Sequence, residues 1–445
     1  MNKQLRTLLA DPRLTDKLRV LANGAPGSAL VSHTLDLGTA CEDWLAYLPA
    51  NASYWYRAQP ALSEFRLGIG HALHVSSDGP QRFAALANAY AGLSHDWRHD
   101  GQALAFCGFA FDAQTSNNEL PAALLAVPSI LLESINGRCR MTLSSTVDHL
   151  GEAPGHWAQL LNQSASIETA QGFSEADRTL AERAWVARVN AAKRDISQGR
   201  IDKVVLARSR KLLADAPISA RQLLETLSEQ QPDACIYAFR QGGSTFLGAT
   251  PERLIHLAGR QIESDALAGT AWPGSGDLAG SKNQHEQSLV VQAIMQALEP
   301  LCVLPPSAMP VEVHAAGQLT HLRSRITGQV LNGVSLFDLI RALHPTPAVG
   351  GYPTSAALNW LAEHNEQRSG WYSGGIGMLD GEGNGEFSVA LRSALIQGKT
   401  IELHAGAGIV ADSDPWQELA ETNAKLGTLL DALHKNRNQS QRKEQ

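Results

Sequence analysis

The feature that most constrains the fold is a succession of three β-type segments, at residues 371–379, 386–396 and 400–404. Each segment is rich in apolar residues, and the two turns between them are short and contain glycine. Short turns join antiparallel neighbours, because a parallel pair of strands needs a crossover of about a dozen residues or more. These segments therefore predict an antiparallel meander near the carboxyl end of the chain.

Strand and helix signals upstream of the meander predict an α+β fold. Strands are expected at residues 202–208 and 244–249, and helices at 81–93 and 175–198. These signals divide the chain into three regions. Residues 1–170 form a β-rich half without a chemical motif, residues 171–435 form a catalytic region, and residues 436–445 form a polar tail. We expect the first two regions to form one continuous core.

Composition excludes several classes of protein. The 445 residues carry a net charge of -7, which disfavours nucleic-acid binding. The five cysteines are widely spaced and include no CxxC pair, so we expect reduced core thiols rather than a disulfide framework or a zinc site. No apolar run approaches about eighteen residues, and the amino terminus lacks a signal-peptide core. We expect a cytoplasmic protein that acts on a small molecule and makes no membrane contact.

Glu286 is the first candidate for chemistry, because helical periodicity places it on a buried stripe. Val290, Ile294 and Leu298 follow it at four-residue spacing. Burying an ionised carboxylate without a counter-charge costs several kcal/mol, so this acid needs a cation nearby.

A second helix, expected to begin at Pro415, carries two more acids and a lysine on one face: Glu418, Glu421 and Lys425. The two buried helix starts thus each offer carboxylates. A lysine, an arginine or a divalent cation between them would satisfy the acids. We favour a hard metal ion shared by the two helices, because such ions bind carboxylate oxygens.

Arg392 lies in the segment 386–396, where strand alternation gives it small neighbours on the same face. A guanidinium in such a recess is suited to a bidentate grip on a carboxylate. Pairing with a structural acid explains a lone arginine equally well.

Lys203 and Glu252 are candidates for a base and an acid. Lys203 lies in an apolar strand, where loss of hydration favours the neutral amine that a general base needs. Most strand lysines, however, simply extend to the surface. Glu252 directly follows a strand end, and pairing with Arg253 or capping a turn is the alternative to a catalytic role.

Residues 406–411 fit a GxGxxA pattern, which raises a dinucleotide-binding fold as a rival. That pattern should open a helix directly after a parallel strand, whereas here the helix begins only near Pro415. We therefore interpret Gly406 and Gly408 as positions where the backbone approaches a ligand closely. His344, in a proline-rich segment, is by default a loop histidine with satisfied hydrogen bonds.

The order of these motifs resembles that of the chorismate-utilising enzymes, over residues 202–433. The matching segments are KVVLAR, FLGATPERL, ALAGT, HEQSLVV, LHPTPAVGGYP, GWYSGGIG, GEFSVALRS, AGAGIV and ELAETNAKL. The resemblance implies large antiparallel sheets that form a two-lobed core flanked by helices. Within the family, the chain is most similar to isochorismate synthases.

The resemblance also implies a set of site residues. Mg²⁺ would hold the C1 carboxylate of chorismate, with Glu286 and Glu421 as ligands and Glu418 acting through a bound water. The positions that match the family's substrate-binding residues are Tyr372, Arg392, Gly408 and Lys425, with Ala268, Gly269, Thr270 and His344 lining the pocket.

Within the family, two positions separate the chemistries. Aminodeoxychorismate synthases place a nucleophilic lysine where this chain has Ala268, so a covalent route is not expected. In isochorismate and salicylate synthases, the lysine at the position of Lys203 activates water. Lys203 would take a proton from water that attacks C2 of chorismate, and Glu252 would protonate the departing C4 hydroxyl. The product would be isochorismate.

Three alternatives to this function stay open. A salicylate synthase would form isochorismate and then eliminate pyruvate, using the same base, acid and metal ligands. An anthranilate-type aminating synthase would need ammonia from a glutaminase subunit, which we do not expect here. A degenerate homologue that only binds or assembles would lack a polar group of the site. The product would enter siderophore, salicylate or menaquinone biosynthesis.

Gln287 is a departure from the family, which commonly has histidine after the metal-binding glutamate. The carboxylate itself is retained, so we expect no loss of function. The resemblance also suggests a monomer.

Overall fold

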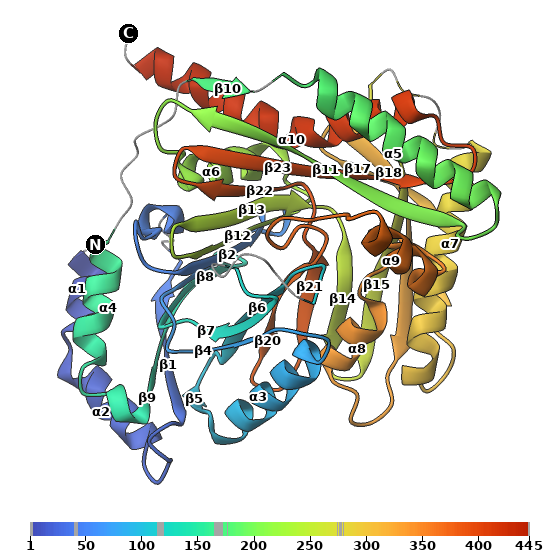
Figure 1. The fold of residues 1–445 in the computed structure, drawn as a ribbon. Coiled ribbons are helices and arrows are strands. Elements are labelled where there is room, and N and C mark those ends of the chain that lie inside the picture. Colours follow the sequence, from blue (N-terminus) through green and yellow to red (C-terminus); the bar gives the residue numbers. More distant parts are fainter. Residues whose placement is uncertain are drawn as a thin grey trace.

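The computed structural model describes residues 3–39, 43–113, 120–163, 172–175, 177–273, 275, 278 and 280–443. Two large β-sheets and the helices that cover them make up this part of the chain (Figure 1). Neighbouring strands run antiparallel, except for the parallel pair β1 and β5. The prediction of an α+β fold built on large antiparallel sheets is confirmed.

The larger sheet has thirteen strands among the described residues. In spatial order they are β10 (Phe173–Glu175), β11 (Lys203–Ala214), β23 (Thr400–Ile409), β22 (Ser393–Gln397), β13 (Ser244–Thr250), β12 (Cys235–Gln241), β2 (Tyr54–Gln59), β3 (Glu64–Ile69), β8 (Ile130–Ile135), β9 (Arg138–Thr146), β1 (Leu30–Gly38) and β5 (Arg98–Asp100), with β19 (Gly351–Tyr352) beside β11.

The smaller sheet has ten strands in the same part of the chain. In spatial order they are β16 (Ser307–Ala308), β18 (Leu319–Gln329), β15 (Gln261–Ala271), β14 (Arg253–Ala258), β21 (Gly385–Val389), β20 (Gly375–Asp380), β6 (Leu104–Phe109), β7 (Ala123–Val127) and β4 (Leu73–Ser77), with β17 (Glu312–Ala316) beside β18. Both sheets take strands from residues 1–170 and from residues 171–435, since β2 pairs with β12 and β6 pairs with β20.

An aromatic core joins the two sheets. Trp55 of the larger sheet stacks on Phe106 of the smaller sheet, with ring centroids 5.6 Å apart. Phe239, also from the larger sheet, stacks on Trp371 at 4.7 Å. All four side chains are almost fully buried. Such rings bury a large apolar area and hold the sheets face to face.

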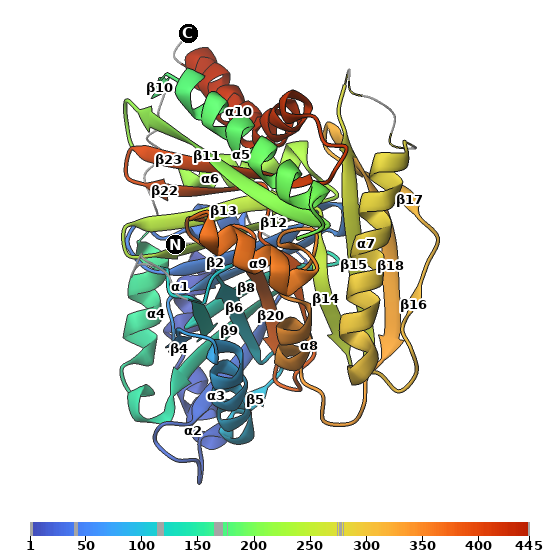
Figure 2. The same cartoon turned by 45° about the vertical axis from the view of Figure 1, so that its right-hand side comes forward.

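Helices cover the outer faces of the sheets (Figure 1 and Figure 2). They are α1 (Lys3–Leu9), α2 (Pro12–Leu21), α3 (Arg82–Asp96), α4 (Ala153–Asn162), α5 (Thr179–Ser197), α6 (Ala220–Gln230), α7 (Ser281–Leu298), α8 (Leu336–Leu343), α9 (Thr354–Glu363) and α10 (Pro415–Lys443). Among the residues described, no helix is both long enough and apolar enough to cross a bilayer.

Two helices position the candidate chemistry, and both begin where the sequence predicts. Helix α7 packs against β15 and β18, and α10 packs against β23. The side chain of Asp414 accepts hydrogen bonds from the backbone NH groups of Trp416 and Gln417, which caps the start of α10. The helix continues to Lys443, so its backbone runs into the region 436–445 where the sequence predicts a polar tail.

The predicted meander is wrong in one respect, because residues 386–396 do not form one strand. Strands β20 and β21 form a hairpin in the smaller sheet, whereas β22 and β23 form a hairpin in the larger sheet. The chain crosses from one sheet to the other over residues 390–392. Arg392 has a φ of 49°, in the left-handed region that non-glycine residues rarely adopt. The candidate carboxylate-binding arginine therefore lies at a crossover rather than within a strand.

The cysteines differ in part from expectation. Cys107, Cys235 and Cys302 are buried free thiols, as predicted. Cys139 is disulfide-bonded, which contradicts the expectation that all five are reduced. Cys41 lies outside the described residues.

Candidate active site

Most of the predicted site residues line one cavity, formed by both sheets and by the starts of α7 and α10. These residues are Glu252, Ala268, Gly269, Thr270, Glu286, Tyr372, Arg392, Gly408, Glu421 and Lys425. The cavity has a volume of about 70 Å³. Two lysine–glutamate pairs, Lys203–Glu286 and Lys425–Glu421, lie in or beside its wall.

Arg392 is held in the cavity by His321, a residue that the sequence reasoning missed. The NH2 group of Arg392 lies 3.0 Å from Nε2 of His321, and Nδ1 of His321 lies 2.9 Å from the carbonyl oxygen of Gly269. Because a guanidinium can only donate, Nε2 accepts and Nδ1 carries the proton. Burial and the Arg392 charge hold the pKa of His321 well below its ordinary value, so the ring is neutral. A single strand histidine gives little signal in the sequence.

Arg392 itself stays charged at neutral pH, although burial lowers its pKa to about 10. Its guanidinium makes no ion pair with an acid among the described residues, so the alternative of a structural acid partner is not supported. Tyr372 lines the same part of the cavity and stacks on His404, with ring centroids 5.2 Å apart. Arg392 and Tyr372 thus give this side of the cavity a positive charge and a hydroxyl group.

Glycine is required at two positions of the cavity, at Gly408 by a close approach to other side chains and at Gly269 by the backbone conformation. A Cβ atom on Gly408 would lie 2.4 Å from Oε1 of Glu286 and 2.7 Å from Cε of Lys203. Gly269 has a φ of 65° where the register of β15 against β18 shifts. Glycine adopts this conformation without strain. Both positions therefore let the chain pass close to the polar groups of the cavity.

The GxGxxA pattern does not belong to a dinucleotide-binding fold. Gly406 and Gly408 lie on β23, which pairs antiparallel with β11. The fold that the pattern would signal needs a parallel strand that leads directly into a helix. The structure contains neither feature at this position, so this rival is excluded.

Lys203 is fully buried beside the cavity and pairs with Glu286. Its Nζ lies 2.8 Å from Oε1 of Glu286. Burial acts to raise the pKa of Glu286, but the charge and hydrogen bond of Lys203, together with the charges of Lys282 and Lys425, hold the pKa below its ordinary value. The predicted base and a predicted metal ligand are therefore in direct contact, and Lys203 does not extend to the surface.

The two acids of α10 are also paired with lysines. Nζ of Lys425 lies 2.6 Å from Oε1 of Glu421, and Nζ of Lys282 lies 2.6 Å from Oε1 of Glu418. Glu418 is buried next to the cavity rather than in its lining, and burial together with the Glu421 charge raises its pKa to about 7. Burial acts to lower the pKa of Lys282, yet Glu418, Glu421 and Glu286 raise it above its ordinary value. Three acids from two helices thus act on one ammonium.

Glu252 is buried, and one of its carboxylate oxygens has no hydrogen-bond partner among the described residues. Burial and the nearby Asp265 raise its pKa to about 8, so it holds a proton at neutral pH. The alternative pairing with Arg253 does not occur, because Arg253 pairs with Glu263 and Glu386. Glu252 therefore presents an uncommitted carboxylic acid to the cavity.

His344 does not line this cavity, contrary to what the resemblance implies. Its Nε2 lies 3.2 Å from the carbonyl oxygen of Phe111, and the rings of Phe83 and Phe109 contact it edge-on. Burial lowers its pKa to about 3, so the ring is neutral. His344 is the loop histidine with satisfied hydrogen bonds that its own sequence context indicates.

Gln287, the departure from the family, is buried on the sheet side of α7. Its Nε2 donates to the carbonyl oxygen of Ala266 at 3.0 Å and to Oγ of Ser324 at 3.3 Å. These bonds tie α7 to β15 and β18. The glutamine therefore fixes the helix that carries Glu286.

A larger hollow beside α7 is not assigned to the reaction. Its walls include Met295, Met309, Val311 and Val313, and among the described residues Glu299 is the one charged group that lines it. A single acid does not supply the acid, base and cationic groups that the polar cavity brings together. The polar cavity is therefore the candidate active site.

Several known proteins are similar to this chain in sequence. The sequence profile of a family described as chorismate binding enzymes matches residues 26–434. The salicylate biosynthesis isochorismate synthase of Pseudomonas aeruginosa is 37% identical over 409 residues, which cover 85% of this chain and 84% of that protein. The isochorismate synthase MenF of Bacillus subtilis is 39% identical over 259 residues, which cover 56% of this chain and 55% of that protein.

A solved structure is similar over nearly the whole chain. It is that of MenF, the menaquinone-specific isochorismate synthase from Escherichia coli, with a TM-score of 0.77 and 25% sequence identity. The superposition covers 97% of this chain and 100% of that one.

Proposed function

Because the chain belongs to the family of chorismate-binding enzymes, we propose that it is an isochorismate synthase, an isomerase that converts chorismate to isochorismate. The observation that carries this proposal is the presence, at one polar cavity, of a buried amine and a buried carboxyl that holds its proton. The amine is Lys203 and the carboxyl is Glu252. The names of the relatives from Pseudomonas aeruginosa and Bacillus subtilis support the same reaction.

Arg392, Tyr372 and Lys425 bind and orient the substrate in this proposal. A fixed guanidinium matches the geometry of a carboxylate and adds charge to the hydrogen bonds. Among the described residues, His321 accepts one hydrogen bond from Arg392, and the guanidinium has further donors for a carboxylate. Ala268 offers no amine for covalent attack, so the ring is transformed by water rather than through an enzyme-bound adduct.

Lys203 and Glu252 carry the two proton transfers. Lys203 takes a proton from water as the water oxygen attacks C2 of chorismate. The ring double bonds shift, the C4–O bond breaks, and Glu252 gives its proton to the departing hydroxyl, which leaves as water. One water enters and one leaves, so the product is an isomer of the substrate. Each proton transfer of this kind contributes about 10²- to 10⁴-fold to the rate.

The sheet gives these two groups room for a ring between them. Lys203 lies on β11 and Glu252 lies between β13 and β14, and two strands, β23 and β22, separate β11 from β13. Neighbouring strands are about 4.8 Å apart, so the two backbones are about 14 Å apart. Two long side chains that reach inward from this separation can approach opposite sides of one ring.

Mg²⁺ fits the acids of α7 and α10 in this proposal. As the side chains stand, no three potential ligands within the described part of the chain converge on one point. Glu286, Glu421 and, through water, Glu418 would hold the ion, because carboxylate oxygens are the ligands that Mg²⁺ prefers. When bound, the ion would anchor the substrate carboxylate.

Replacing Glu421 with glutamine should weaken Mg²⁺ binding and substrate binding together. Glutamine keeps the size of the side chain but removes one charged ligand, and we expect the Mg²⁺ concentration for half-maximal activity to rise at least about tenfold. Magnesium titrations of activity, together with calorimetric titration of Mg²⁺ alone, measure the effect. Glu418→Gln is the matched control and should have a smaller effect, since Glu418 lies outside the cavity lining. Unchanged Mg²⁺ dependence in Glu421→Gln would remove this ligand from the proposal.

The reaction itself is tested by incubating the purified protein with chorismate and Mg²⁺ and separating the products by chromatography. Isochorismate is expected to accumulate without ammonia and without a second enzyme. Salicylate and pyruvate without added lyase would instead identify a salicylate synthase. Ammonia-dependent anthranilate would identify an aminating synthase, and no turnover would leave a binding protein.

A further inference from the structure

A second cavity, separate from the active site, lies between the start of α3, the end of α8 and the loop after α9. Its volume is about 350 Å³, larger than that of the active-site cavity. Arg368 forms part of the wall between the two cavities. Its NH1 and NH2 groups donate to the carbonyl oxygens of Val349 and Val205, which line the active-site cavity, at 2.9 Å each. The proposed reaction uses no residue of this second cavity.

Two buried arginines of this cavity have uncommitted hydrogen-bond donors. Arg82 is 4% exposed, and its NH2 group donates to the carbonyl oxygens of Ala110 and Phe111. Its Nε and NH1 groups, and Nε of Arg368, have no hydrogen-bond partner among the residues that the structure describes. Buried polar groups are normally hydrogen-bonded, and three unsatisfied guanidinium donors at one cavity are therefore unusual.

The charges around the cavity leave one net positive charge for a ligand. The lining holds three arginines, Arg82, Arg341 and Arg368, against two acids, Asp112 and Glu366. Arg341 pairs with Asp338, and Glu366 contacts Arg188 and lies 4.0 Å from Nε of Arg368. Asp112 is exposed and makes no ion pair with Arg82 or Arg368 in the described part of the chain. The balance favours a ligand with a single negative charge.

The remaining walls are apolar and aromatic. Phe111 stacks under the guanidinium of Arg368, whose central carbon lies 3.7 Å from the ring centroid. Phe83 and Leu361 line the same space. A strongly hydrated anion such as phosphate would lose its water against these walls, whereas an apolar ring or chain gains from the contact. A ligand with an apolar body and one carboxylate satisfies both parts of the cavity.

We infer that this cavity is a second ligand site, which binds a small monocarboxylate with an apolar body through the unpartnered Nε and NH1 donors of Arg82. The carboxylate would accept hydrogen bonds from the Arg82 guanidinium, with the charge of Arg368 on the same wall, and the apolar body would lie against Phe83 and Leu361. Asp112 at the opening would oppose binding by repulsion. The inference concerns binding alone and does not depend on the reaction that the active site performs.

Calorimetric titration of the full chain with benzoate, and with benzamide as its neutral isostere, tests this inference. Benzoate should bind at least tenfold more tightly than benzamide, because the charge-assisted bonds are lost with the amide. The titration is repeated in Arg392→Ala, since benzoate can also enter the active-site cavity. Binding that persists in Arg392→Ala identifies the second site, and loss of all binding in that variant overturns the inference.

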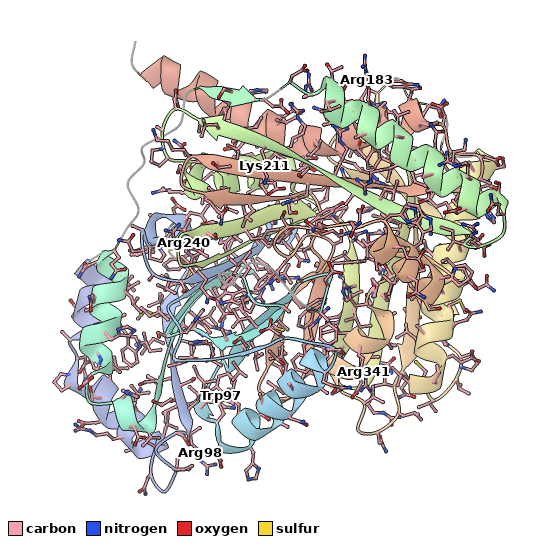
Figure 3. The ribbon with its side chains drawn as sticks, viewed as in Figure 1. Trp97, Arg98, Arg183, Lys211, Arg240 and Arg341 are labelled. Atoms are coloured by element: carbon pink, nitrogen blue, oxygen red, sulfur yellow. The ribbon has the colours of Figure 1, made fainter. Side chains whose placement is uncertain are left out.

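Variants of the cavity complete the test. Arg82→Gln should weaken benzoate binding at least tenfold, whereas Asp112→Asn should strengthen it. Arg341→Gln is the matched control, because Arg341 lies on the same cavity but is largely exposed and already paired on α8 (Figure 3). It should leave the dissociation constant unchanged. If Arg82→Gln fails to fold, Asp112→Asn still decides the question, since unchanged affinity there contradicts binding at this opening.

Discussion

Replacing Lys203 with alanine should lower kcat about 10³-fold, because the variant lacks the base that takes a proton from water. The structure adds a second consequence. Lys203 is the ion-pair partner of Glu286, at 2.8 Å, so its removal leaves a buried carboxylate without its cation. The alanine variant should therefore also be less stable, and its thermal midpoint must be measured beside its turnover.

Lys203→Arg separates the catalytic effect from the structural one. Arginine keeps the positive charge beside Glu286 but does not release its proton at any working pH, so it cannot act as a base. We expect the arginine variant to lose turnover about as fully as the alanine variant while it keeps more of the stability. Chromatographic measurement of isochorismate formation gives kcat and KM for both variants.

Lys211 provides a control on the same strand. It lies on β11 with a side chain that is 68% exposed, and it does not line the cavity (Figure 3). Lys211→Ala should leave kcat and KM unchanged. If Lys203→Arg keeps turnover within about tenfold of the unmodified enzyme, Lys203 is not the general base of the reaction.

Replacing Glu252 with glutamine should lower kcat about 10²- to 10³-fold, because the amide cannot protonate the departing C4 hydroxyl. The side chain keeps its size, and substrate binding should change little. Burial and Asp265 raise the pKa of Glu252 to about 8, so kcat/KM of the unmodified enzyme should fall as the pH rises through about 8. This fall should be absent from the residual activity of Glu252→Gln.

The same substitution should stabilise the protein. In the folded state Glu252 holds its proton up to about pH 8, whereas in the unfolded chain it ionises near 4.5. The folded state therefore binds more protons between these pH values, and the free energy of unfolding falls as the pH rises. At pH 7 the loss amounts to about 3 kcal/mol, which glutamine would avoid.

Denaturation curves of the unmodified protein and Glu252→Gln at pH 5 and pH 7 measure this gain. The difference between the two proteins should be larger at pH 7. Glu263→Gln is a suitable control, since Glu263 is 38% exposed and pairs with Arg253. A pH-activity profile of Glu252→Gln that is identical to that of the unmodified enzyme would exclude Glu252 as the acid.

The sequence was most informative where charge and periodicity conflict. An acid on an apolar helical stripe can be seen without a structure, because burying an unpaired carboxylate is costly. Glu286 and the start of α10 were predicted in this way, and both lie where expected. The antiparallel sheets were predicted from short turns, for an equally local reason.

Contacts between distant segments of the chain were harder to predict from the sequence. Residues 386–396 read as one strand because their apolar alternation is continuous, yet the chain changes sheets at Arg392. His321, from β18, gave no signal because its role depends on Arg392 and Gly269, which are remote in sequence. His344 was assigned to the pocket by resemblance, but tertiary packing places it among aromatic rings.

The sequence by itself determined which residues carry charge into apolar surroundings and which elements hold them, because both depend on spacing along one strand or helix. Tertiary structure alone decided how charges on different elements are paired. Lys203 pairs with Glu286, and Lys282 pairs with Glu418, because of how the helices dock against the sheets. The physical reason is that Coulomb interactions and desolvation depend on distance in space, which a linear pattern does not contain.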